Sequence, residues 1–337
     1  MFTRKISTAL AVPLAAVGLA LATPAGAQTI ELKVSHFLPP NHTFQKAMVA
    51  WASELEKQSN GRLKLQIYPA GQLGGGPNRQ FDAARNGIVD VAISLHGATP
   101  GRYAMTELVS LPYASPKAGS SSAIASKRLT ELAPAYLAKE HEGLRILWMA
   151  VTPPLMFHSK SPIRTIEDFK GLRVRYAGAQ FKNIIDALGA VPLLVPPQET
   201  QDALSKGIVD AATFPYEGAA SFDLGTIAKN TLEPGVSSAS FAVVMNPAKY
   251  NSLPADLKAL IDKTTGPAAA ESFGKMWDEA EAAGKASLLA KGVQVHVLPD
   301  SELSKMKKLF APQVDAAIAA VEKQRKPGRK FFDDYTK

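Results

Sequence analysis

An eleven-residue segment occurs twice in this chain, and it constrains the fold more than any other feature. Residues 82–92 read DAARNGIVDVA and residues 202–212 read DALSKGIVDAA, so seven of eleven positions agree across a separation of 120 residues. Each copy is typical of a short helix that ends at a glycine with positive φ and leads into a buried strand. The separation is too long for a solenoid repeat and fits two domains of similar fold. We therefore expect two related lobes, with chance matching of common helix-to-strand residues as the alternative.

The N-terminal segment indicates export. Arg4 and Lys5 precede an apolar run over residues 6–22, and AGA at 25–27 has the small-x-small pattern of a signal-peptidase site. We predict a signal peptide over residues 1–27, a mature start near Gln28 and a periplasmic location. The alternative is a membrane anchor, although the run is shorter than the ~20 residues that span a bilayer. Removing 27 of 337 residues leaves 310, more than one core usually holds, which again favours two lobes.

Composition narrows the possible partners and sites. The formal net charge is +8, about +6 without the signal peptide, and basic residues are spread along the chain. A solvated C-terminal helix end explains their one concentration better than nucleic-acid binding does: Lys323, Arg325, Lys326, Arg329 and Lys330. The chain has no cysteine, which excludes disulfides, thiolate metal sites and a thiol nucleophile. Its stability must therefore come from a large core.

Hydrophobic periodicity predicts an α/β chain. Strands are expected at 30–37, 63–68, 172–176 and 293–298, with helices at 43–58 and 301–322. Thr165 and Asp168 predict the start of a short helix that Gly171 ends. Residues 254–291 predict a long helix that is interrupted or kinked at Gly266 and Pro267.

Two apolar segments are expected to cross between the lobes and form a hinge. They are residues 143–150 and 240–245, both of which read as strands. The first lobe is then expected to comprise residues 28–148 with about 241–285. The second lobe is expected to comprise residues 149–240 with about 286–337.

The motifs of common enzymes and cofactor sites are absent. The glycine-rich loop at 71–77 fits neither a dinucleotide fingerprint nor a P-loop, and the sequence has no Gly-x-Ser-x-Gly or His-Glu-x-x-His motif. The six histidines lack ligand spacing, so a metal site built on His36 and His42 is not favoured. We predict no enzymatic activity, no cofactor and no metal. His36 and His96 follow predicted strands, where open α/β sheets bind ligands, so they are candidate cleft residues, with turn or surface positions as the alternative.

Arg175 is the strongest candidate for ligand binding. In LRVRY, Leu172, Val174 and Tyr176 share one face of the predicted strand, and Arg173 and Arg175 share the other. The pattern alone is also typical of an edge strand with a solvated face, and by itself it favours that interpretation. A family resemblance shifts the balance towards a binding role.

The resemblance rests on residues 166–175, which read IEDFKGLRVR, followed by LGA at 188–190 and by the segment 199–210. This order is similar to the Asp-Leu-Lys-Gly-x-x-x-Arg signature and the segments after it in the DctP family, the solute-binding proteins of tripartite ATP-independent periplasmic (TRAP) transporters. The chain resembles these proteins from about residue 30 to 325. The resemblance implies a two-lobed periplasmic binding protein fold with mixed sheets, hinge strands and a long helix that spans both lobes. It also implies that Arg175 holds the carboxylate of a small organic acid, since a guanidinium matches a carboxylate with two parallel hydrogen bonds.

Two departures from the family pattern bear on the ligand. The alignment puts Leu155 where a second arginine is common, and Phe214 where an asparagine is common. Further apolar side chains are candidates for the cleft, although each could equally belong to the core: Trp148, Phe157, Tyr216 and Phe37. We therefore expect a monocarboxylate with an aromatic or branched apolar body. The expected partners are this acid and the TRAP membrane subunits, with an ABC-type receptor or a periplasmic hydrolase as alternative functions.

Overall fold

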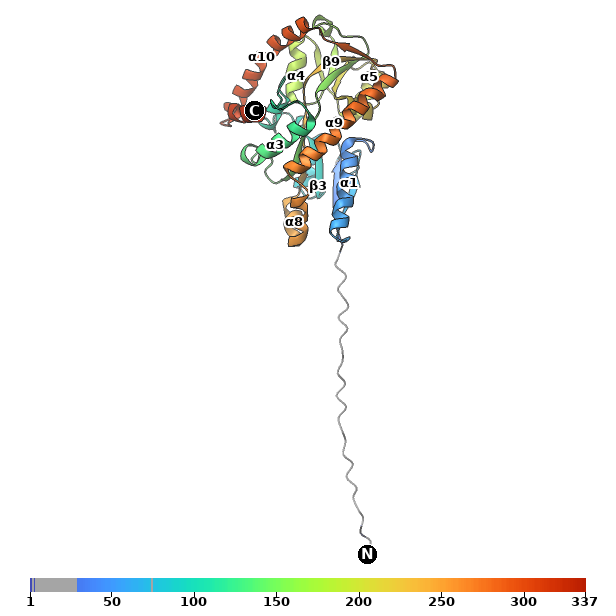
Figure 1. The fold of residues 1–337 in the computed structure, drawn as a ribbon, viewed down its shortest axis with the longest axis vertical. Coiled ribbons are helices and arrows are strands. Elements are labelled where there is room, and N and C mark those ends of the chain that lie inside the picture. The colour runs from blue at the N-terminus through green and yellow to red at the C-terminus, as the bar shows by residue number, and fades with distance from the viewer. Residues whose placement is uncertain (2, 4–28, 74) are drawn as a thin grey trace.

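The computed structural model describes Met1, Thr3, residues 29–73 and residues 75–337. Apart from Met1 and Thr3, the predicted signal peptide lies outside the described residues, and so do Arg4, Lys5 and the proposed cleavage site. The described chain forms two lobes, each built on one mixed β-sheet with helices packed around it (Figure 1). The expected α/β class with two lobes is confirmed.

The first sheet has five strands in the order β2-β1-β3-β10-β4. Strand β1 pairs in parallel with β2 and β3, whereas β10 lies antiparallel between β3 and β4. The expected strands at 63–68 and 240–245 coincide with β2 and β10. The bounds are β1 Ile30–His36, β2 Leu63–Tyr68, β3 Val91–Leu95, β4 Arg145–Val151 and β10 Ser240–Met245.

The second sheet has six strands in the order β11-β9-β5-β8-β6-β7. Strand β6 pairs in parallel with β7 and β8, and β5 lies antiparallel between β8 and β9. Strand β6 is thus internal, so the interpretation of residues 172–176 as an edge strand is wrong. The bounds are β5 Leu155–Ser159, β6 Arg173–Tyr176, β7 Val191–Leu194, β8 Ala211–Phe214, β9 Asn230–Ser237 and β11 Gln294–Val297.

Helices cover both sheets. The expected helix over 43–58 coincides with α1, and the expected short helix after Thr165 is one 3₁₀ turn, Glu167–Phe169. The α-helices are α1 Thr43–Gln58, α2 Pro77–Arg85, α3 Ser122–Tyr136, α4 Ala179–Ala187, α5 Thr200–Ser205, α6 Tyr216–Ser221, α7 Pro247–Ser252, α8 Ala255–Lys263, α9 Pro267–Ala290, α10 Asp300–Glu322 and α11 Gly328–Thr336. Other 3₁₀ turns are His96–Ala98, Thr106–Ser110, Pro197–Glu199 and Leu224–Thr226.

The sequence repeat marks equivalent units of the two lobes. Its copies span the end of α2 to β3 and the end of α5 to β8, and both of its glycines have positive φ, 72° at Gly87 and 69° at Gly207. The Asp90 carboxylate accepts a hydrogen bond from the backbone N–H of Lys33 at 2.8 Å, and Asp210 accepts one from Arg173 at 3.0 Å. In each lobe the repeated aspartate therefore ties the turn to the neighbouring parallel strand. Five strands of each sheet follow the same order and directions, β2-β1-β3-β10-β4 in the first and β7-β6-β8-β5-β9 in the second, so the lobes share a topology.

Two short segments join the lobes and meet at the hinge. Residues 152–154 connect β4 to β5, and residues 238–239 connect β9 to β10. The backbone N–H of Thr152 donates to the carbonyl of Ala239, and the N–H of Ala239 donates to Thr152 Oγ1, each at 2.9 Å. The crossings therefore lie side by side, a few residues away from the predicted boundaries at 148 and 240.

The long helix α9 spans both lobes, as Figure 1 shows. Near its middle, Asp278 accepts hydrogen bonds from the first two N–H groups of α3 in the first lobe, the shorter at 2.7 Å. One turn later, Glu281 accepts two hydrogen bonds of 2.8 Å from the first N–H groups of α6 in the second lobe. Each acid satisfies backbone donors that a helix N-terminus leaves free. One helix therefore caps a helix of each lobe.

The C-terminal helices return to the first lobe. Ile318 and Val321 of α10, with Phe331 and Tyr335 of α11, share a buried cluster with Leu129 of α3. Of residues 286–337, which were expected in the second lobe, β11 does pair with β9 of the second sheet, whereas the end of α10 and all of α11 pack on the first lobe. The apolar face of α11 needs a partner, and α3 supplies it. None of the helices in the described residues combines the length and apolarity that a membrane crossing requires.

Candidate ligand-binding site

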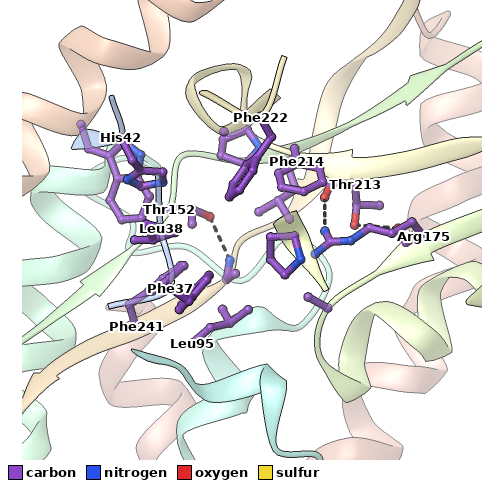
Figure 2. Close-up of a pocket in the computed structure, with 17 residues that line it drawn as sticks. Phe37, Leu38, His42, Leu95, Thr152, Arg175, Thr213, Phe214, Phe222 and Phe241 are labelled. Atoms are coloured by element: carbon purple, nitrogen blue, oxygen red, sulfur yellow. Dashed lines mark hydrogen bonds between the residues drawn. The ribbon is translucent and has the colours of Figure 1, made fainter. Parts of the chain in front are cut away.

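A cavity lies between the lobes where the carboxyl ends of their parallel strands meet. Its wall includes Leu95 at the end of β3, Arg175 of β6 and Phe214 at the end of β8, together with residues of the hinge and of α9 (Figure 2). About 450 Å³ of atom-free space lies in the cavity and its mouth, open solvent included, and about 50 Å³ of it can hold the centre of a water-sized molecule. Open α/β sheets bind ligands at this edge, because the loops that follow the strands diverge there. The cavity is therefore the candidate site.

Arg175 is the charged residue on which the site is built. The internal strand β6 buries it to 2% exposure, and two backbone carbonyls hold its guanidinium. Arg175 Nε donates to the Val195 carbonyl at 2.9 Å, and Nη1 donates to the Thr213 carbonyl at 3.1 Å. Nη2 is buried and has no hydrogen-bond partner among the residues that the structure describes. The guanidinium is thus fixed in place with one nitrogen still free to donate.

The charge of Arg175 is not neutralised by the described residues. Desolvation alone lowers the pKa of Arg175, to about 9, and no described carboxylate contributes to that shift. The side chain therefore remains cationic at neutral pH. The ring of Phe214 lies under the guanidinium, with the Arg175 Cζ 4.2 Å from the ring centroid, and an aromatic face offers only weak compensation. A buried cation of this kind calls for an anionic ligand.

The remainder of the wall is largely aromatic. Phe37 stacks on Phe241 with ring centroids 6.3 Å apart, Phe241 meets Trp277 edge to face at 5.7 Å, and Phe222 lies 5.7 Å from Phe214. These rings come from the turn after β1, from β8, from β10, from α9 and from the segment after α6. The cavity therefore offers aromatic surface from both lobes around one cation.

A second ionisable group on the wall, His42, is already committed to its neighbours. Its Nδ1 accepts a hydrogen bond from the Phe44 N–H at 3.1 Å, so its proton is on Nε2, which faces Glu217 of the other lobe at 3.3 Å. Burial lowers the pKa of His42, so the ring is neutral. Glu217 also accepts hydrogen bonds from Thr43 and from Trp277 Nε1. These groups tie the lobes together and leave Arg175 as the free charge among the described residues of the wall.

Four of the sequence-predicted site residues line the cavity. They are Arg175, Phe214, Phe37 and Leu155, which come from β6, β8, the turn after β1 and the start of β5. Leu155 and Phe214, which the alignment placed where polar side chains are common, both present apolar surface here. The predicted carboxylate anchor and three of the predicted apolar residues are thus brought together.

The other five predicted residues lie outside the cavity wall. His36 Nε2 contacts Gln45 Oε1 at 2.7 Å, and His96 Nε2 contacts His141 Nε2 at 3.0 Å within the first lobe. Trp148 packs edge to face on Trp51, Phe157 packs on Phe169, and the Tyr216 hydroxyl donates to Glu233. Each of these five side chains thus has a core or polar partner within its own lobe.

Several wall residues have no signal in the sequence that distinguishes them from core. Phe222, Phe241 and Trp277 are buried aromatics, and their place in the cavity depends on contacts between distant segments. Thr152 follows the predicted crossing strand, and its position at the hinge could have marked it. No group of three or more His, Cys, Asp or Glu side chains in the described ranges is arranged to hold a metal ion.

Comparison with known proteins agrees with this architecture. Residues 34–320 match the model of the bacterial extracellular solute-binding protein family 7, DctP. A C4-dicarboxylate-binding periplasmic protein of Rhodobacter capsulatus is 27% identical over 318 residues, which is 94% of each chain.

Two solved structures are similar in fold and sequence. A TRAP solute-binding protein of Rhodoferax ferrireducens, in complex with copurified benzoate, has a TM-score of 0.87 and 29% identity, covering 91% of this chain and 96% of its own. A marine metagenome TRAP solute-binding protein specific for aromatic acid ligands, in complex with 3-hydroxybenzoate, has the same TM-score and identity, covering 91% and 97%. These proteins are receptors of transport systems. The chain therefore belongs to the DctP family of TRAP solute-binding receptors and is not an enzyme.

Proposed function

We propose that this receptor captures an aromatic monocarboxylate in the periplasm and delivers it to TRAP membrane subunits. The observation that supports the proposal is Arg175, a buried cation on the wall of an aromatic-lined cavity, whose Nη2 has no hydrogen-bond partner among the described residues. A carboxylate would supply the missing charge and accept the free N–H. The ring of the acid would pack on Phe37, Phe214 and Phe222.

The energetics require both parts of the ligand. A hydrogen bond to a charged group contributes about 1.5–3 kcal/mol, whereas micromolar binding needs about 8 kcal/mol. The aromatic body must provide the remainder, through apolar burial at roughly 25 cal/mol per Å² and through contacts between rings. Lobe closure would enclose that surface.

The wall favours one carboxylate over two. A second carboxylate needs a second cation or several donors, but His42 is neutral and bonded, and Leu155 and Phe214 are apolar. Burying an unpaired carboxylate against these side chains would be costly. The two solved relatives that hold benzoate and 3-hydroxybenzoate agree with a monocarboxylate, whereas the dicarboxylate-binding relative from Rhodobacter would suggest a different ligand.

Calorimetric titration tests the proposal at Arg175. We expect benzoate or a hydroxybenzoate to bind, and succinate to bind at least tenfold more weakly. Arg175→Lys should weaken aromatic acid binding by about 10- to 100-fold, because an ammonium cannot reproduce the planar fork. Arg173→Lys is the matched control on the same strand, since Arg173 is exposed and pairs with Asp210, and it should change affinity less than twofold. Tight succinate binding without aromatic acid binding, or normal binding by Arg175→Lys, would contradict the proposal.

Transport requires that the lobes open and close about the hinge. We propose that the paired crossings at 152–154 and 238–239 are the axis, and that the first sheet, within residues 29–151 and 240–245, moves against residues 155–237. Small-angle scattering should show an increase in compactness on adding the bound acid. An unchanged radius of gyration at saturation would contradict the hinge.

A further inference from the structure

Thr152 occupies a distinctive place in the cavity wall. It lies at the hinge, is almost fully buried and contributes its side chain to the cavity (Figure 2). Its Oγ1 accepts the hydrogen bond from the Ala239 N–H at 2.9 Å, and its own N–H donates to the Ala239 carbonyl. Two bonds therefore fix the residue, while the proton of its hydroxyl is not used by either of them.

The other side-chain donors on the described wall are used within the protein. Thr213 Oγ1 donates to the Arg175 carbonyl at 3.3 Å, and Trp277 Nε1 donates to Glu217 at 3.2 Å. His42 directs its single proton to Glu217. Two donors are left for a ligand, Arg175 Nη2 and the Thr152 hydroxyl. A hydroxyl that is buried among aromatic rings cannot donate its proton to water. An acceptor on the ligand would therefore strengthen binding.

Figure 2 shows the Thr152 hydroxyl and the Arg175 guanidinium on different sides of the cavity, with Phe214 beside the arginine. A carboxylate held by Arg175 would leave the ring of the acid facing Thr152. We propose that Thr152 donates a hydrogen bond to a hydroxyl oxygen on this ring, so that the receptor prefers hydroxylated aromatic monocarboxylates over unsubstituted ones. The inference rests on the proposed function, and it names Thr152 as the residue that determines this preference.

The test compares affinities within one protein. Calorimetry would measure benzoate and the three hydroxybenzoate isomers on the wild type, Thr152→Val and Thr152→Ser. We expect at least one isomer to bind the wild type more tightly than benzoate, by about three- to tenfold, as one neutral hydrogen bond allows. Thr152→Val should reduce the ratio of hydroxybenzoate to benzoate affinity to about one. Thr152→Ser, which keeps the hydroxyl, should preserve the wild-type ratio.

The ratio of hydroxybenzoate to benzoate affinity shows whether Thr152 recognises the ring hydroxyl or has only a structural role. Thr152→Val also removes the acceptor for the Ala239 N–H, which would weaken every acid alike and leave the ratio unchanged. If Thr152→Val does not fold, Thr152→Ala provides a second measurement of the same ratio. An unchanged ratio in the variants, or no preferred isomer in the wild type, overturns the inference while benzoate binding still supports the proposed function. Failure of all four acids to bind the wild type overturns both.

Discussion

In the proposed function Arg175 serves ligand recognition, but its burial lowers the stability of the ligand-free protein. A buried guanidinium without an acidic partner costs desolvation energy, which its bonds to two carbonyls only partly offset. Arg175→Met should therefore raise the free energy of unfolding of the ligand-free protein by about 1–3 kcal/mol. The same variant should lose the stabilisation by an aromatic acid, which at a hundredfold excess over Kd is about 2.7 kcal/mol for the wild type.

Denaturant unfolding with and without the acid measures both effects. Arg173→Met is the control, because it removes an exposed ion pair with Asp210 and should change stability by no more than about 1 kcal/mol. A ligand-free Arg175→Met protein that is clearly less stable than the wild type would show that the two carbonyl bonds outweigh the desolvation of the charge.

Some of the residues of the site could be predicted from the sequence, and others could not. Arg175 could be predicted because a motif fixes its place on β6, and Phe37 because it follows β1. The rule that ligands bind after parallel strands locates an edge of the sheet, but not the face to which each side chain turns. His36 therefore turns to Gln45 while the next residue, Phe37, meets the cavity. Trp277 could not be predicted, since its apolar spacing on α9 is also that of a core residue.

At the scale of elements, the long helix α9 relies on glycines where it touches each lobe. A Cβ on Gly274 would lie 2.4 Å from the backbone of Ala123, and one on Gly284 would lie 2.7 Å from the backbone of Tyr216 and Glu217. These close approaches allow Asp278 and Glu281 to reach the N-termini of α3 and α6. The predicted interruption at residues 266–267 is also explained, because Pro267 begins α9 and the Gly266 N–H donates to the Leu147 carbonyl.

Gly284→Ala should destabilise the protein although alanine is the better helix former. Helix propensity alone predicts a gain of about 1 kcal/mol. The close backbone contact predicts a loss of about 1–3 kcal/mol, since α6 must move from α9 and its cap from Glu281 must lengthen. Thermal unfolding decides between these signs, and the exposed neighbour Ala283→Ser serves as the control. An increase in Tm for Gly284→Ala would show that the two helices can separate without cost.

Hydrophobic periodicity and turn residues predicted most helices and strands, because a helix or strand depends mainly on residues that are close in sequence. The expected bounds of α1, β2 and β10 match the structure. The position of the C-terminal helices did not follow from such patterns, because Phe331 and Tyr335 bury their rings against α3, nearly two hundred residues earlier in the chain. The internal place of β6 likewise depends on β7 and β8, which lie on either side of it.

At the scale of the whole molecule, the lobes also meet at a pair of glycines. A Cβ on Gly97 of the first lobe would lie 2.5 Å from the Cα of Gly178 in the second. Glu107 of the first lobe lies beside this contact and is 3% exposed, and one of its carboxylate oxygens has no hydrogen-bond partner in the described part of the chain. The structure therefore places an acid at the N-terminus of α4, which starts at Ala179 in the opposite lobe.

This acid should make the stability of the two-lobed structure depend on pH. Burial, and secondarily the charge of Glu140, raises the pKa of Glu107 from 4.5 to about 7. Between about pH 4.5 and pH 7, Glu107 keeps a proton in the native state that it has released in the unfolded chain. The contribution of Glu107 to stability therefore falls as the pH rises through this window. Glu107→Gln should remove this loss. Its unfolding free energy relative to the wild type should stay constant below pH 4.5 and grow by up to about 3 kcal/mol by pH 8. Exposed Glu142→Gln is the control, and a Glu107→Gln difference that is flat from pH 5 to 8 would show that Glu107 is ionised in the native state throughout.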